Sequence, residues 1–439
     1  MIKLSDHFTY KKLFKFSLPT ILMMIFTSVY CVVDGFFVSN FAGSVSFDAL
    51  NFIIPLLLVL GSVGFMFGSG GAALIGKTLG QNKKERANSI FSMVIVVSII
   101  IGVMLAVLGF VFIEPIAILM KAEEYLLEDA ILYGRILLVA LPFYILQFEF
   151  QCLFATAEKN KIGLYVTLAA GFTNMICDAL FVGLFKWGIA GAAAATGLSQ
   201  FIGAIIPIIY FSLPNSSLLR FSKFKLNFKD IGIITLNGSS ELVSNVSMSV
   251  VSMLYNAQLL KYENSLTAYG VLMYVSMIFQ AIFIGFTVGT APITSYNFGA
   301  KNHLEIKNVL KKSLVIISIF SLTMFICGEL FAKPIGLIFF SGYSDIVELI
   351  VYAFRIFSIS FLLTGFTFHG SSFFTALNDG ITSMVISFLR TLVFYILSIT
   401  LLPIFFELDG IWWSIVLAEG LGAITSIIFI LANKKKYKY

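Results

Sequence analysis

The chain has 439 residues, of which 59% are hydrophobic and only 12% are charged, and its formal net charge is +6. A soluble protein of this length could not cover its surface with so few charged residues. The composition therefore excludes a soluble globular protein and indicates an integral membrane protein whose apolar surface faces lipid.

Apolar segments long enough to cross a membrane recur along the whole chain. A transmembrane helix needs about 20 apolar residues and a transmembrane strand only about 10, so the segment lengths predict helices. The predicted spans are residues 14–39, 50–77, 89–113, 131–156, 162–186, 188–213, 231–260, 267–297, 310–333, 348–376, 382–405 and 409–432. We therefore predict an all-α fold, a polytopic membrane protein of twelve transmembrane helices.

Lysine and arginine are distributed unequally among the predicted loops. With the amino terminus in the cytoplasm, 22 of the 29 basic residues fall in cytoplasmic segments. The outer loops hold only Lys121, Lys186, Lys261 and Lys333. Because cytoplasmic loops are enriched in basic residues, we predict a multi-pass protein of the cell membrane with both termini in the cytoplasm. Topology then explains the net charge, and no nucleic-acid partner is expected.

Two pairs of segments resemble each other at an offset of 219 residues. Residues 68–90 align with 287–310, and residues 154–160 align with 373–379. Six spans separate the copies, so both copies cross the membrane in the same direction. This predicts two six-helix bundles related by a pseudo-twofold axis along the membrane normal, as in transporters. The predicted parts are an N-lobe (1–213), a cytoplasmic linker (214–230) and a C-lobe (231–439).

Of the acidic residues inside the predicted spans, five are singled out as candidates: Asp34, Glu149, Asp178, Glu241 and Glu419. A charged side chain costs at least about 2.5–3.5 kcal/mol at the centre of a bilayer. Each acid therefore needs a proton, a partner or a position near a helix end. The sequence leaves open the roles of Glu241 and Glu419, and also those of His369 and Arg390, which lie in spans as well.

Other oxygen-bearing side chains are expected near Asp178. Asn174 lies four residues earlier, on the same helix face. The small-residue run "GIAGAAAATG" opens the next helix and would let its Thr196 meet Asp178 across a close helix pair. Together with Asp34, these groups would form a site of hard oxygen ligands. Because burial and a neighbouring carboxylate both favour a protonated acid, we predict a site for Na⁺ or for a shared proton.

Four motifs occur in order along the chain: "SLP" with Pro19 ahead of "VDGFFVSNFAG", then "GKTLGQNKKERA", "TNMICDALFVGLFKWGIAGAAAATG" and "APITSYNFGAKN". Through these motifs the chain resembles the multidrug and toxic compound extrusion (MATE) family along nearly its whole length. The resemblance implies a V-shaped pair of six-helix bundles that exports organic, often cationic, compounds in exchange for H⁺ or Na⁺.

The resemblance also implies roles for particular residues. Pro19 matches a family proline linked to bending of the first helix. Some family branches carry coupling acids in helices 7 and 10, but the tenth span here has no acid between Tyr352 and Leu377. Coupling is therefore expected in the N-lobe. The residues matching the family's cation site, which would ligate Na⁺ if it is the coupling ion, are Asp34, Asn174, Asp178 and Thr196.

We expect a cation-coupled antiporter that exports amphipathic, mainly cationic compounds by alternating access. It would be a monomer in the lipid bilayer, would not be an enzyme, and would need no cofactor besides H⁺ or Na⁺. Phe and Met adapt to varied apolar ligands, which favours them as walls of a substrate chamber. The candidate chamber residues are Met66, Phe148, Met248, Met273, Phe279 and Phe286, together with Glu149.

Three alternatives remain open at this stage. A lipid-linked sugar flippase of the same wider superfamily would favour several basic residues in its cavity, and the spans offer only Arg135, Arg355 and Arg390. A membrane enzyme would need a catalytic cluster of His, Cys and acidic residues, which the spacing does not show. A channel would need a pore-loop signature, and the two-lobe repeat favours a transporter instead.

Overall fold

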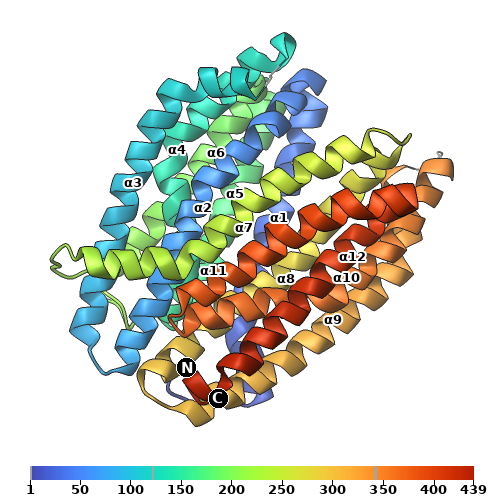
Figure 1. Cartoon of the computed structure of the whole chain (residues 1–439). Coiled ribbons are helices and arrows are strands. Elements are labelled where there is room, and N and C mark those ends of the chain that lie inside the picture. Colours follow the sequence, from blue (N-terminus) through green and yellow to red (C-terminus); the bar gives the residue numbers. More distant parts are fainter. Residues whose placement is uncertain (1, 121–122, 341–343) are drawn as a thin grey trace.

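The computed structural model describes residues 2–120, 123–340 and 344–439, so the predicted outer-loop residue Lys121 lies outside the described residues. Within these ranges the chain is helical almost throughout and contains no strand, which confirms the all-α prediction (Figure 1). We call helices α1–α6 the N-lobe and helices α7–α12 the C-lobe. In Figure 1 the N-lobe is coloured blue to green and the C-lobe yellow to red.

The N-lobe elements are α1 (Tyr10–Phe37), the π-helical segment η1 (Val38–Ala42), α2 (Ser44–Gly80), α3 (Lys84–Leu119), α4 (Glu124–Thr156), α5 (Asn160–Asp178), the π-helical segment η2 (Ala179–Leu184) and α6 (Gly188–Ser212). The C-lobe elements are α7 (Phe228–Leu259), α8 (Ser265–Gly299), α9 (His303–Phe339), α10 (Ser344–Ala376), α11 (Gly380–Phe388), the π-helical segment η3 (Leu389–Phe394) and α12 (Tyr395–Tyr437).

Helix α12 contains parts of two membrane spans. Glu407 has φ 49° and ψ −127°, which interrupts the helical backbone in the middle of α12. The carboxylate of Glu419 accepts a hydrogen bond from Tyr395, and Asp379 accepts one from Tyr437. Residues after Glu407 therefore pair in reverse order with residues before it, so the chain turns back at this point. The eleventh predicted span ends at this turn and the twelfth begins there.

The predicted spans are all present, although not all of them are equally apolar. Ten helical stretches are long and apolar enough to cross a membrane, and the last of these, Gly380–Tyr437, contains both the eleventh and the twelfth span. Helix α7 is long enough but carries many serines and asparagines and two acids, so it falls outside that set. The helices also extend past the apolar windows, as α9 does relative to residues 310–333, because helical hydrogen bonding continues into polar ends.

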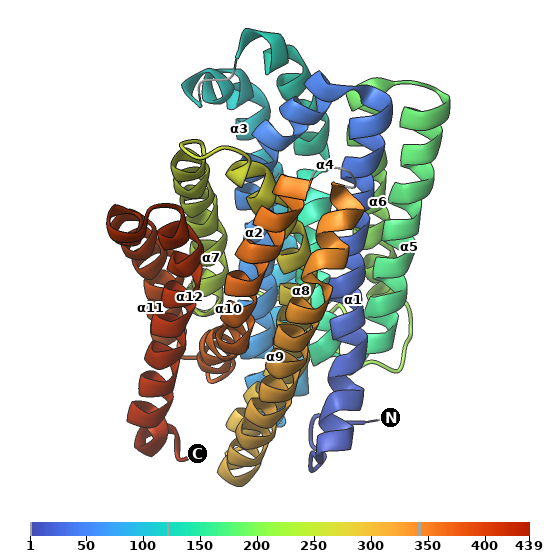
Figure 2. The same ribbon diagram turned by 90° about the vertical axis from the view of Figure 1, so that its right-hand side faces the viewer.

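Both termini lie at the same end of the molecule, at the bottom of Figures 1 and 2, and we call this end the terminal face. The two lobes approach each other closely towards this end. A Cβ atom on Gly299 of α8 would lie 1.9 Å from the carbonyl oxygen of Lys77 on α2, and one on Gly238 of α7 would lie 1.8 Å from that of Met66. Only glycine permits such contact between helix backbones.

We expect Gly238→Ala to lower the thermal unfolding midpoint of the detergent-solubilised protein. The added methyl group would clash with the α2 backbone, and overpacking of this kind costs about 1–3 kcal/mol. Gly232→Ala is the matched control in the same helix, because a Cβ there would meet no atom within 4 Å. Alanine favours helix by up to about 1 kcal/mol over glycine, so this control should be neutral or stabilising. Equal midpoints for the two variants would contradict the close packing.

Candidate functional site

The four residues predicted to form a cation site come together in the N-lobe. Asn174 and Asp178 on α5 are 1% and 0% exposed. Asn174 Nδ2 donates a hydrogen bond to Thr196 Oγ1 of α6 at 3.3 Å. Asp34 on α1 faces Asp178, Thr196 and Asn174 closely enough for all three to act on its charge. Three helices therefore deliver two carboxylates, one amide and one hydroxyl to a single point.

Several oxygens of this cluster have no hydrogen-bond partner within the part of the chain that the structure describes. They are Asp34 Oδ1, both carboxylate oxygens of Asp178, and Asn174 Oδ1. A buried carboxylate without a partner is costly, so a proton or a cation would stabilise the cluster. Oxygen-only ligands suit hard cations such as Na⁺ better than thiophilic metals. Among the described residues there is no group of three or more His, Cys, Asp or Glu side chains that could hold another kind of metal ion.

Both acids of the cluster lie next to a π-helical segment. Segment η1 begins at Val38, four residues after Asp34, and segment η2 begins at Ala179, directly after Asp178. Such segments form i→i+5 hydrogen bonds, which span one residue more than those of the α-helix, and they occur frequently at functional sites. The sequence analysis missed them, because the apolar pattern around both acids continues through the extra residue.

Pro19 lies in α1 and is buried. Proline has no backbone N–H group, so the carbonyl group of Lys15 loses its usual helical partner. The helix nevertheless continues unbroken from Tyr10 to Phe37. Next to the proline, Ser17 and Thr20 pack against Gly289 of α8. The bending role of Pro19 stays a prediction, and its position places it where α1 contacts the other lobe.

A second candidate site is a cavity of about 210 Å³ between the lobes. Its N-lobe wall consists mostly of small or apolar side chains: Phe65, Ser69, Ala72, Ala73 and Cys152. Its C-lobe wall carries many polar or charged side chains, including Glu241, Ser244, Asn245, Gln280, Thr287, Ser371, Ser372, Thr375, Ser387, Arg390, Thr391, Tyr395 and Glu419. The cavity is therefore strongly polar on one side only.

Of the predicted chamber residues, only Met248 lines this cavity. Glu149 and Phe286 are 0% exposed and lie inside their lobes, and both carboxylate oxygens of Glu149 lack a partner. Met66 is buried in the N-lobe core, and Phe279 packs on Phe361. The remaining two also belong to packed regions: Phe148 stacks on Phe65, and Met273 packs against the C-lobe core. The chamber role of these residues stays a prediction, because the sequence gives the type of each side chain and not the helix face on which it lies.

The partner of Arg390, which the sequence could not name, is Glu419. The Arg390 Nε and Nη2 atoms donate to Glu419 Oε1 at 3.2 and 3.0 Å. Tyr395 also donates to Oε1 at 2.9 Å, and Thr367 donates to Oε2 at 3.0 Å. The Arg390 guanidinium group lies 4.0 Å from the centre of the Phe368 ring. Glu419 therefore has a complete set of donors.

Glu241 stands apart from that pair. It lines the cavity and lies within range of the charge on Arg390, yet it forms no ion pair within the described ranges. With Arg390 balanced by Glu419, an ionised Glu241 gives the cavity one excess negative charge. His369, whose role the sequence left open, is buried beside Phe286 and Phe373, and it is not among the lining residues.

Comparison with known proteins identifies the family. The MatE family model matches residues 19–180 and 240–400, which is most of the chain. The chain belongs to the MATE family. It is thus a transporter and not an enzyme. The two matched ranges fall in the two lobes, and the twofold-repeat fold of this family agrees with the predicted pair of six-helix bundles.

Several relatives carry the name multidrug export protein MepA, and two of them are described here. The one from Staphylococcus haemolyticus is 27% identical over 435 residues, covering 97% of this chain and 94% of that protein. The one from Staphylococcus saprophyticus is 24% identical over 430 residues, covering 96% and 93%. A crystal structure of a MATE protein in the straight conformation superposes with a TM-score of 0.92 at 21% identity and covers 98% of each chain.

We expect Arg390→Met to lower the free energy of unfolding by about 3–5 kcal/mol, because it leaves Glu419 as an unpaired buried charge. The double variant Arg390→Met/Glu419→Gln removes both charges and should recover more than half of the loss. The midpoint of thermal unfolding in detergent measures both effects. A single variant as stable as the unchanged protein would show that the pair is not needed for stability.

Proposed function

We propose that this protein is a cation-coupled antiporter that exports amphipathic, mainly cationic organic compounds by alternating access. The observation that carries the proposal is the N-lobe cluster of Asp34, Asn174, Asp178 and Thr196, in which three carboxylate oxygens have no hydrogen-bond partner among the described residues. Family membership and the relatives named for multidrug export support it. The coupling ion is H⁺ or Na⁺, since the cluster offers only oxygen atoms.

The inter-lobe cavity is the proposed substrate site. When Glu241 is ionised, the excess negative charge of the cavity favours a cationic group on the substrate. Its apolar N-lobe wall favours an uncharged hydrophobic part on the opposite side of the substrate. The many hydroxyl and amide groups of the C-lobe wall are too widely spread to demand one shape, which suits broad specificity.

Helix α1 is the proposed link between the ion and the substrate. It carries Asp34, packs against α5 of the N-lobe, and also packs against α8 of the C-lobe. Binding of a cation or proton changes the charge of the Asp34 cluster by one unit. Such binding can drive transport only if it favours one conformation of the two lobes over the other. Because α1 belongs both to the Asp34 cluster and to the contact between the lobes, it can make the arrangement of the lobes depend on the bound ion.

The remaining parts of the proposal concern the setting of the protein. We propose that it acts as a monomer in the cell membrane, with both termini in the cytoplasm and no cofactor besides the coupling ion. The terminal face is then the cytoplasmic face. Lobe contacts near it, such as the hydrogen bond from Asn378 Nδ2 to the Ala73 carbonyl oxygen at 3.1 Å, separate the cavity from the cytoplasm.

We expect Asp34→Asn and Asp178→Asn each to fold normally and to lose gradient-driven export, because each removes a charge on which coupling depends. The double variant should be little worse than either single variant, since both residues act in one site. Dye transport by everted membrane vesicles, with H⁺ and Na⁺ gradients imposed separately, measures this and identifies the ion. Asp345→Asn is the control, because Asp345 is exposed and lies outside the cluster.

Normal export by Asp34→Asn under both gradients would refute the proposed coupling site. If the unchanged protein exports the dye under neither the H⁺ nor the Na⁺ gradient, cation coupling itself is refuted. These two outcomes are distinct, because the second concerns the unchanged protein alone.

The orientation predicts opposite labelling of two lysine positions. In a background lacking the four native cysteines, we expect a thiol introduced by Lys261→Cys to react with a membrane-impermeant reagent added outside intact cells. A thiol introduced by Lys83→Cys should react only after the membrane is permeabilised. The reverse pattern would place the termini outside.

A further inference from the structure

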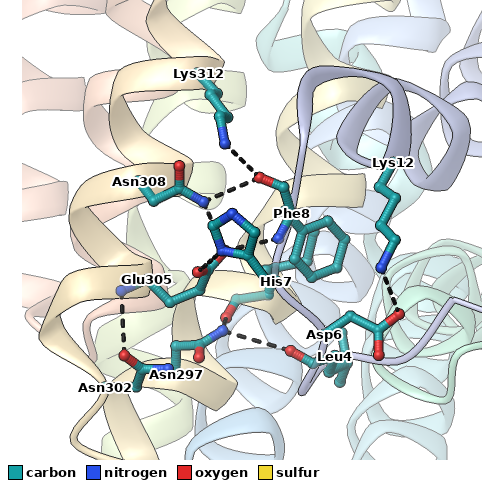
Figure 3. Close-up of polar contacts among 11 residues, drawn as sticks. Leu4, Asp6, His7, Phe8, Lys12, Asn297, Asn302, Glu305, Asn308 and Lys312 are labelled. Atoms are coloured by element: carbon teal, nitrogen blue, oxygen red, sulfur yellow. Dashed lines mark hydrogen bonds and ion pairs between the residues drawn. The ribbon is translucent and has the colours of Figure 1, made fainter.

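The segment of residues 3–9, which precedes α1, lies against the terminal face and is partly buried there. We call it the amino-terminal segment. Leu4 and Phe8 are both 0% exposed, and they belong to the same buried cluster as C-lobe residues such as Val309. Figure 3 shows this segment beside Asn297, Glu305, Asn308 and Lys312, which come from α8 and α9. An N-lobe segment is thus docked on the C-lobe.

Side chains of the C-lobe bind the segment mainly through its backbone. Glu305 Oε1 accepts a hydrogen bond from the Phe8 N–H at 2.9 Å, and Glu305 Oε2 lies 2.7 Å from His7 Nδ1. The carbonyl oxygen of Phe8 accepts hydrogen bonds from Asn308 at 3.0 Å and from Lys312 at 2.7 Å. Asn297 donates to the Leu4 carbonyl oxygen at 3.4 Å.

Glu305 is the centre of this arrangement. It is 6% exposed, and one carboxylate oxygen accepts from both Phe8 and Asn308 while the other faces His7 (Figure 3). Its own backbone N–H is capped by Asn302 at 3.2 Å, so the side chain projects from a fixed first turn of α9. Charge-assisted hydrogen bonds are the stronger kind, and here they cross from one lobe to the other.

The other end of the segment is tied to the N-lobe. The Leu4 N–H donates to Glu158 Oε1 at 2.6 Å, and Glu158 lies in the turn between α4 and α5. At residue 10 the segment continues into α1, which belongs to the N-lobe. A rigid movement that parts the lobes at the terminal face must therefore break the bonds to Glu305, Asn308 and Lys312.

We propose that Glu305 is a positioning residue of the transport cycle: it clamps the amino-terminal segment across the lobes, holds the terminal face closed, and releases the segment when that face opens. The proposal rests on alternating access as proposed above. It adds a specific contact whose strength sets how often the terminal face opens, at a place remote from both the cation cluster and the cavity.

Two measurements on the purified full-length protein in detergent test this. Hydrogen–deuterium exchange over residues 3–9 reports docking of the segment. The reaction rate of a thiol introduced by Ser295→Cys, in the background without native cysteines, reports opening of the face. Ser295 is 0% exposed and faces α2, since a Cβ on Gly76 would lie 2.1 Å from its Oγ. Neither measurement needs a substrate or an ion gradient.

We expect Glu305→Gln to speed exchange over residues 3–9 and to raise the thiol reaction rate roughly tenfold, the scale set by losing a hydrogen bond to a charged group. The matched control is Asp6→Asn. Asp6 lies in the same segment, but its ion pair with Lys12, at 3.4 Å, stays within the N-lobe. This control should leave both rates unchanged.

Faster exchange without faster thiol labelling would overturn the proposal, because the segment would then be docked without closing the face. Unchanged rates in both measurements would overturn it as well. Lys312→Gln, which weakens the same contact at Phe8 but retains Glu305, should shift both rates in the same direction by less. If Glu305→Gln does not fold, this second variant decides. If the unchanged protein shows no export, the antiport function is refuted, but these two measurements remain valid.

Discussion

The energetic cost of burying a charge away from water governs the organisation of this protein. Each lobe contains carboxylates deep inside a membrane-spanning bundle, and the lobes meet that cost differently. In the C-lobe, Glu419 is satisfied permanently by Arg390, Tyr395 and Thr367. In the N-lobe, Asp34 and Asp178 retain oxygens without a partner. A carboxylate that is neutralised by a neighbouring side chain needs no ion, whereas the open carboxylates of the Asp34 cluster are the ones that we propose respond to one.

That difference fits the proposed division of roles between the two repeats. The repeat gives both lobes the same six-helix plan; in the proposed mechanism the N-lobe cluster takes up an ion or proton from solvent, whereas Glu419 of the C-lobe is paired with the guanidinium group of Arg390. The lobes are then joined where side chains are smallest. Gly238 and Gly299 bring helix backbones into direct contact near the terminal face, and α1, which carries Asp34, packs on α8 at Gly285 and Gly289.

Much of the fold could be predicted, because lipid imposes length and polarity on every span. The twelve spans and the internal repeat follow from that constraint. Within the proposed cation site, Asn174 and Asp178 share a helix face by simple spacing, and Thr196 follows a run of small residues, so the structure brings together residues whose local pattern was informative.

The cavity wall could not be predicted in this way. Phe286 and Glu149 are the right residue types, but which face of a helix points to the other lobe depends on packing between distant segments. The pairing of Arg390 with Glu419, 29 residues apart across a helical turn-back at Glu407, likewise depends on tertiary structure.

The one-sided polarity of the inter-lobe cavity has a mechanical consequence. Hydrogen-bonding and charged groups such as Glu241, Asn245 and Gln280 are fixed on the C-lobe, while the facing wall offers mainly alanine and aromatic surfaces. A molecule bound through its polar groups would therefore stay attached to the C-lobe and move with it. The N-lobe could slide past it and lose only non-directional contacts, which re-form wherever apolar surfaces meet. If the lobes change their relative tilt, as alternating access requires, the apolar wall would therefore add little to the energetic barrier at the position of the substrate.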